Sequence, residues 1–168
     1  MAHEFVQQVA RSLEALNPPS TLLVAVSGGA DSVALLQAIH LARGRKALRH
    51  VGLVVGHVDH QLRPDSGLDA ELVERHAHRL GLPFVKERLE LGSRTNLEER
   101  ARDARYAALV RLARSRGGEA IVTGHSLTDQ AETLLGRLSR GSGARGLAAC
   151  GPSGRSRGFG CCVRCWAV

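Results

Sequence analysis

The sequence is poor in aromatic residues and contains no long hydrophobic run. Its 168 residues include one tryptophan, one tyrosine and three phenylalanines, which argues against an aromatic platform for stacking single-stranded nucleic acid. No apolar run approaches the roughly 20 residues that a membrane-spanning helix needs, so we expect no membrane partner. The first residues lack the charged-then-apolar layout of a signal peptide, and we therefore expect a cytoplasmic protein.

Lysine is scarce although the chain is strongly basic. The formal net charge is +7, and all of the 23 basic residues except Lys46 and Lys86 are arginine. A positive balance favours a polyanionic partner such as nucleic acid. A GC-rich genome would produce the same excess of arginine, so charge alone does not identify the partner. The length is that of one domain with a sizeable core.

Cysteine is missing from most of the chain. All four cysteines fall near its end, at Cys150, Cys161, Cys162 and Cys165. Cys162 and Cys165 form a CxxC pair, and one interpretation of this spacing is half of a zinc or iron–sulfur site. A homodimer would have to supply the other half. Residues 151–168 show neither strand alternation nor helical periodicity, and the interpretation we favour is a frameshifted or truncated end.

These patterns predict one domain followed by a short tail. The domain is expected at 1–149, with an N-terminal helix within 1–18 that ends before Pro18 and Pro19. The tail at 150–168 is expected to be irregular and exposed. The cysteines would then play no part in the working domain.

The most informative segment is the turn at residues 27–32 (SGGADS). It follows the apolar run 22–26 and precedes the helix-like residues 33–36. A strand, a turn with two adjacent glycines and a helix bring backbone N–H groups and a helix N-terminus to one place, which favours an anion. The hydroxyls of Ser27 and Ser32 are candidate additional donors. The turn is not a Walker A loop, because the Gly-Lys-Ser/Thr ending is absent; an unliganded tight turn is the alternative.

Strand and helix patterns alternate along the rest of the chain. Strands are expected at 21–26, 50–58, 83–89 and 120–123, and helices at 5–16, 30–42, 66–79, 95–115 and 127–139. This alternation predicts an α/β fold with a doubly wound, mainly parallel sheet and helices on both faces. Ligands of such sheets bind beyond the carboxyl ends of the strands.

Three further segments carry polar residues next to these elements. Residues 57–63 (HVDHQLR) end the second strand and are either a polar loop or metal ligands. From spacing alone, residues 96–106 (NLEERARDARY) are interpreted as an ordinary salt-bridged, solvated helix face. In residues 123–133, Asp129 and Glu132 share a helix face near its N-terminus, where acids also pair with the helix dipole.

Together and in this order, the segments resemble the tRNA isoleucine lysidine synthetase family of PP-loop ATPases. SGGADS resembles the family's PP-loop, and HVDHQLR and NLEERARDARY resemble its next two motifs. The most diagnostic block is GHSLTDQAET followed by RLSRGSGARGL, and the resemblance runs over about residues 22–147. It implies an enzyme that uses ATP to adenylate the wobble cytidine of an isoleucine tRNA with a CAU anticodon. Free lysine then displaces AMP.

The resemblance also implies roles for individual residues. The ATP phosphates would be bound by Ser27, Gly28, Gly29, Ala30, Asp31 and Ser32. Asp31 would also orient Mg²⁺. Asp129 and Glu132 would recognise the ammonium groups of lysine, with Arg105 and His125 lining the same pocket. We expect the catalytic set to be Asp31, Arg105, His125 and Asp129, with His125 able to take a proton from the attacking amine.

The sequence departs from the family pattern at two places. Ser126 and Thr128 stand where the family block GHHxDDQAET has a histidine and an aspartate. The family continues after the matched region into another strand and tRNA-binding domains, so we expect an unpaired sheet edge beside the strand at 120–123. Two other interpretations stay open. One is a PP-loop tRNA thiolation enzyme of the 2-thiocytidine type, and the other is a degenerate fragment that only binds nucleotide.

Overall fold

The computed structural model describes residues 2–15, 20–59, 66–89, 97–124 and 161–164. They form one five-stranded sheet in the order β3-β2-β1-β4-β5. The strands are β1 (Thr21–Ala25), β2 (Gly52–Asp59), β3 (Phe84–Arg88), β4 (Ala120–Gly124) and β5 (Cys161–Arg164). The helices are α1 (Ala2–Ala15), α2 (Ala30–Ala42), α3 (Ser66–Arg79) and α4 (Leu97–Ser115), with a 3₁₀ turn η1 (Lys46–Leu48).

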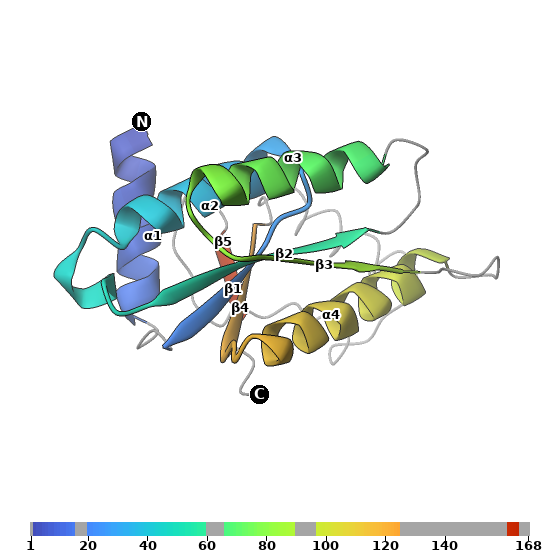
Figure 1. Cartoon of the computed structure of the whole chain (residues 1–168). Helices are drawn as coiled ribbons and strands as arrows, with labels where there is room; N and C mark the ends of the chain where they lie inside the picture. Colours follow the sequence, from blue (N-terminus) through green and yellow to red (C-terminus); the bar gives the residue numbers. More distant parts are fainter. Residues whose placement is uncertain (1, 16–19, 60–65, 90–96, 125–160, 165–168) are drawn as a thin grey trace, which may run out of the picture.

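Helices cover both faces of the sheet, as the sequence predicted. α1, α2 and α3 lie on one face and α4 lies on the other (Figure 1). Leu22 and Val24 of β1 face the first layer, whereas Leu23 faces α4. A strand that is buried on both faces has to be apolar at successive positions, which explains the continuous apolar run in β1. The prediction of an α/β fold with a mainly parallel sheet is confirmed.

A glycine follows the C-terminal end of each of the helices α3 and α4. Gly81 follows α3 with φ +64°, and the next N–H, from Leu82, donates to Ala77 O at 3.0 Å. Gly117 follows α4 with the same φ, and Gly118 N–H donates to Ala113 O at 2.8 Å. This left-handed ending satisfies helix carbonyls that would otherwise lack partners. Both helix ends lie close to the positions predicted from the sequence.

The connections place a topological switch point between β1 and β4. α2 and α3 carry the chain from β1 to β2 and on to β3 across one face, and α4 returns it across the other face to β4. β4 then pairs in parallel with β1, with Ala25 opposite Thr123. Ligands of open α/β sheets bind where the connections diverge in this way, beyond the carboxyl ends of the strands.

The edge of the sheet beside β4 is paired, contrary to expectation. β5 runs antiparallel to β4 and places Val163 opposite Val122 and Cys162 opposite Thr123. The sequence predicted an irregular tail and an open edge here, and for residues 161–164 that prediction is wrong. The unpaired N–H and C=O groups of an edge strand can hydrogen-bond to the backbone of any extended segment. Four residues without an alternating pattern are therefore enough to form a strand here. The boundary predicted at 149 stays a prediction.

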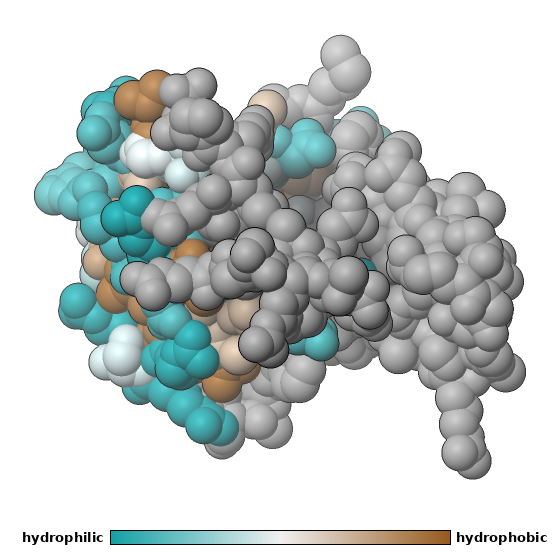
Figure 2. Space-filling view, turned by 90° about the vertical axis from the view of Figure 1, so that its right-hand side faces the viewer, coloured by the Kyte–Doolittle hydropathy of each residue, from teal (hydrophilic) through white to brown (hydrophobic). Residues whose placement is uncertain are grey.

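Other expectations fall outside the described residues or concern the surface. The helix at 127–139 and the start of the helix at 95–96 are not described. Within the described ranges, no helix combines the length and apolarity needed to cross a membrane. Figure 2 shows the side toward which β2 and β3 run, where the described surface is mainly hydrophilic with separate hydrophobic patches.

Candidate functional site

The turn at residues 27–32 joins the carboxyl end of β1 to the first turn of α2. Gly28 has φ +96°, a conformation that costs little only for glycine. Gly29 is the N-cap residue of α2, with φ −69° and ψ 152°, and no side chain caps the helix. The first helical bond runs from Val33 N–H to Gly29 O at 3.1 Å. The N–H groups of the first turn therefore remain available to an anion.

The two serine hydroxyls play different parts in this turn. Ser32 is buried, and its Oγ donates to Gly29 O at 2.8 Å and accepts from Ser27 N–H at 3.2 Å. Ser27 is exposed, and its Oγ accepts from Gly29 N–H at 3.4 Å and lies 3.2 Å from Ser32 Oγ. The Ser32 hydroxyl proton is thus used within the loop. Ser32 shapes the turn, whereas Ser27 keeps a hydroxyl at the surface.

Asp31 lies in the first turn of α2 and is exposed. Its carboxylate forms no ion pair with another described residue. A carboxylate is a hard oxygen ligand of the kind that Mg²⁺ prefers, so Asp31 would be able to hold this ion beside a bound phosphate. The predicted metal role of Asp31 is compatible with this placement and stays a prediction.

The second motif supports the turn from the neighbouring strand. His57 in β2 is buried, and its Nδ1 lies 2.8 Å from the carbonyl oxygen of Val26, directly before the turn. Asp59 ends the strand with its carboxylate 4.0 Å from Arg88 Nε. Among the residues that the structure describes, no three His, Cys, Asp or Glu side chains gather as metal ligands. Residues 60–63 lie outside them.

The first turn of α3 packs against the loop through Asp69. A Cβ built on Gly28 would lie 2.9 Å from Asp69 Cβ and 3.1 Å from its Oδ1. The close approach therefore depends on glycine at position 28. Sequence reasoning missed this contact, because an acid in the first turn of a helix looks like a partner for the helix dipole. No local signal in the sequence connects Asp69 with the loop.

The end of β4 lies beside the same helix terminus. A Cβ on Gly124 would meet Leu35 Cδ2 at 3.3 Å and Ser32 Cα at 3.4 Å. The chain thus leaves the sheet next to the first turn of α2. The predicted site residues that follow Gly124 lie outside the described residues: they are His125, Asp129 and Glu132. Their roles stay predictions.

Arg105 is the predicted site residue on the other face of the sheet. It is half-buried on α4, and its guanidinium carbon lies 5.5 Å from the centre of the Tyr106 ring. Arg102 approaches the same ring at 6.0 Å. These cation–π contacts restrain both guanidinium groups. α4 packs on the opposite face of the sheet from α2, and the assignment of Arg105 to the lysine pocket stays a prediction.

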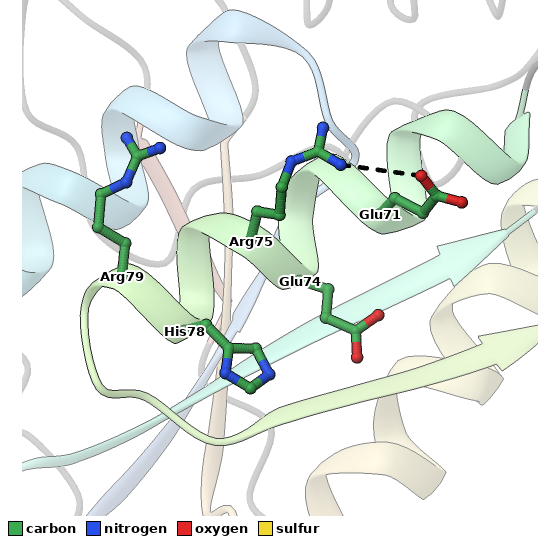
Figure 3. Close-up of a pocket in the computed structure, with 5 residues that line it drawn as sticks. All are labelled: Glu71, Glu74, Arg75, His78 and Arg79. Atoms are coloured by element: carbon green, nitrogen blue, oxygen red, sulfur yellow. Dashed lines mark ion pairs between the residues drawn. The ribbon is translucent and has the colours of Figure 1, made fainter.

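A surface hollow lies away from the turn, on the outer side of α3 (Figure 3). Its lining residues are Glu71, Glu74, Arg75, His78 and Arg79. Glu71 pairs with Arg75, and Glu74 pairs with Lys86 of β3, each at 3.7 Å. A lining that comes from a single helix, with exposed ion pairs along it, is an ordinary solvated face. None of these residues belongs to the predicted site.

Comparisons with known proteins agree with the resemblance seen in the sequence. The model of the PP-loop domain family, an ATP-using family, matches residues 1–164. The tRNA(Ile)-lysidine synthase of Thermus thermophilus is 48% identical over 132 residues, which is 76% of this chain and 25% of that protein. The tRNA(Ile)-lysidine synthase of Novosphingobium aromaticivorans is 44% identical over 135 residues, 80% of this chain and 40% of its own length.

A solved structure supports the fold independently. The U34-tRNA thiolase of Methanococcus maripaludis, solved with its iron–sulfur cluster, superposes with a TM-score of 0.69. The match covers 85% of this chain and 51% of the thiolase at 17% sequence identity, so it shows a common fold and nothing finer. With a family model that spans nearly the whole sequence, relatives named as tRNA(Ile)-lysidine synthases and this fold, the chain belongs to the PP-loop domain family.

Proposed function

We propose that the chain is the ATP-using part of a tRNA(Ile)-lysidine synthase. The observation that carries the proposal is the meeting of two motifs at the switch point. The turn at 27–32 leaves β1, and the block that begins at Thr123 leaves the neighbouring strand β4, with Gly124 against the first turn of α2. The relatives that match about three quarters or more of this chain are named tRNA(Ile)-lysidine synthases.

The first half of the reaction would take place at the turn. The C2 oxygen of the wobble cytidine attacks the α-phosphorus of ATP, and the bond to pyrophosphate breaks. The backbone N–H groups of the first turn of α2 would hold the leaving phosphates. Asp31 would hold Mg²⁺, which when bound offsets the negative charge of the pyrophosphate.

The second half of the reaction would use the block after β4. The amine of free lysine attacks C2 of the cytidine, AMP leaves with the C2 oxygen, and His125 takes a proton from the amine. Asp129 and Glu132 would bind the ammonium groups of lysine, and Arg105 would pair with phosphate through its fixed fork of donors. Support for these roles comes from the sequence match and from the position of Gly124, directly before His125.

The partners of the reaction are part of the same proposal. The chain spans 25% and 40% of the length of the two relatives compared, so tRNA(Ile) and free lysine are proposed substrates of this chain. A net charge of +7 is compatible with a tRNA substrate. A cytoplasmic location and a homodimer stay predictions.

Two assays separate the half-reactions. Exchange of labelled pyrophosphate into ATP, dependent on a tRNA(Ile) transcript with a CAU anticodon, reports adenylation. Release of AMP on addition of lysine reports the second step. Exchange in the absence of that transcript, or no exchange at all, would contradict the proposal.

Glu132→Gln tests the lysine pocket within the same assays. The variant keeps hydrogen bonding but removes the charge, which is worth about 1.5–3 kcal/mol for a charged hydrogen bond. We expect lysine-dependent AMP release to need roughly ten- to a hundredfold more lysine, with pyrophosphate exchange unchanged. Glu71→Gln, on the exposed face of α3, is the matched control. Equal lysine dependence in both variants would refute the assignment.

A further inference from the structure

His57 contacts the backbone at the point where the phosphate-binding turn begins. Its side chain is only 3% exposed, and Nδ1 lies 2.8 Å from the carbonyl oxygen of Val26. A carbonyl can only accept a hydrogen bond, so Nδ1 carries the proton. Val26 is itself held on its other side, because its N–H donates to Gly56 O at 2.8 Å. Two hydrogen bonds from β2 therefore hold Val26, the last residue before the turn.

The peptide unit between Val26 and Ser27 is fixed at both ends. In a planar trans peptide the C=O and the N–H point in opposite directions. Here the C=O accepts from His57, while the Ser27 N–H donates to Ser32 Oγ at 3.2 Å. Ser32 Oγ in turn donates to Gly29 O at 2.8 Å. A chain of hydrogen bonds thus connects His57, through the Val26–Ser27 peptide and the Ser32 hydroxyl, to the N-cap residue of α2.

We propose that His57 is a positioning residue of the PP-loop. Its Nδ1–H holds the plane of the Val26–Ser27 peptide, and this keeps the N–H groups of the turn directed toward the phosphates. The inference rests on the proposed ATP site: His57 lies outside the turn that would bind ATP and supports it from β2. The other ring nitrogen, Nε2, is buried without a partner among the described residues. The supporting contact therefore belongs to one atom, Nδ1.

Three substitutions at position 57 separate that atom from the bulk of the ring. His57→Asn places an amide N–H near the position of Nδ1, whereas His57→Gln carries its amide toward the position of Nε2. His57→Leu keeps bulk and removes every polar atom. His78→Gln, on the exposed side of α3, is the matched control for loss of an imidazole (Figure 3). Thermal unfolding of each variant reports whether it is folded.

The first readout needs no ligand. Hydrogen exchange of the Ser27 amide, followed by NMR on the protein without nucleotide, reports the bond from Ser27 N–H to Ser32 Oγ. We expect the wild type, His57→Asn and His78→Gln to exchange at similar rates. We expect His57→Gln and His57→Leu to exchange about tenfold faster. If the Leu variant does not fold, the Asn and Gln pair still decides the outcome.

The second readout is the affinity for MgATP. We expect His57→Gln and His57→Leu to bind about tenfold more weakly, with His57→Asn restored to near the wild-type affinity. Equal weakening in all three variants, or unchanged Ser27 exchange in the Gln and Leu variants, would overturn the role of His57. If the wild type itself bound no MgATP, the proposed function would fail, while the Ser27 exchange would still decide whether His57 holds the peptide.

Discussion

Single residues set the shape of the turn at 27–32, and Gly28 has the least freedom to change. Its φ of +96° is strained for any other residue, and a Cβ there would lie 2.9 Å from Asp69 Cβ. We expect Gly28→Ala to lower the free energy of unfolding by more than Gly81→Ala. Gly81 has φ +64°, and a Cβ there would have no atom within 4 Å. The Gly81→Ala variant therefore measures the cost of the backbone conformation alone, about 1–2 kcal/mol.

The comparison is made by urea unfolding. A difference between the two variants reports the contact with Asp69, and Asp69→Gly in the Gly28→Ala background, which removes the Asp69 Cβ, should recover part of the loss. Equal losses for Gly28→Ala and Gly81→Ala would show that α3 yields to the added methyl group without cost.

Asp31 is the residue on which dependence on magnesium should rest. Removing its carboxylate leaves the charge of the phosphates without a protein-held cation. We expect Asp31→Ala to abolish the Mg²⁺-dependent part of ATP binding, measured by titration with and without the metal. Asp103→Ala, on the exposed side of α4, should change nothing. Unchanged MgATP affinity in the Asp31 variant would remove this residue from the site.

The candidate site was only partly readable from the sequence. The turn at 27–32 was predicted because its chemistry is local: a strand, two glycines and a helix follow one another in the chain. The contacts of His57 with Val26 and of Asp69 with Gly28 join residues on separate elements. Such contacts depend on strand order and helix packing, which spacing in a sequence does not specify.

At the level of elements, the well-predicted boundaries are those with local causes. α2 was predicted and found to end at residue 42, and α3 and α4 end at Gly-containing turns. On the exposed face of α4, Arg111 hydrogen-bonds Glu87 of β3, which raises the pKa of the arginine. The arginine therefore keeps its charge at neutral pH. β5 was missed because residues 161–164 carry no strand pattern of their own. They form a strand by pairing with the edge of β4, which exists only in the assembled sheet.

The pairing of β5 reverses the expectation for deletion of residues 151–168. An irregular tail would be removed without effect, but loss of β5 exposes the edge of β4. We expect the deletion to lower the unfolding temperature and to increase self-association, measured by thermal unfolding and light scattering. Deletion of residues 165–168 alone spares the strand and is the control. Identical behaviour of the two shortened chains would show that β5 contributes nothing to the sheet.

The whole molecule joins two apolar layers through a single sheet. β1 contributes to both cores, since Val24 packs with α2 and Leu23 packs with α4. The turn at 27–32 follows directly after β1, so its first residue is attached to a strand that is packed on both faces. Binding groups that must be held in fixed directions are best placed on such rigid elements.

The charge of the whole molecule predicts how tRNA binding responds to salt. With a net charge of +7, contacts to tRNA phosphates would release counterions, so affinity should fall as the salt concentration rises. Two phosphate contacts suffice for a loss of roughly tenfold between 50 and 200 mM salt. We expect at least this loss for a tRNA(Ile) transcript in filter binding. The affinity for MgATP over the same range serves as the reference, because nucleotide held by oriented N–H groups involves fewer released ions. Binding of tRNA that did not change with salt would rule out an electrostatic interface and leave the arginine excess without a role in recognition.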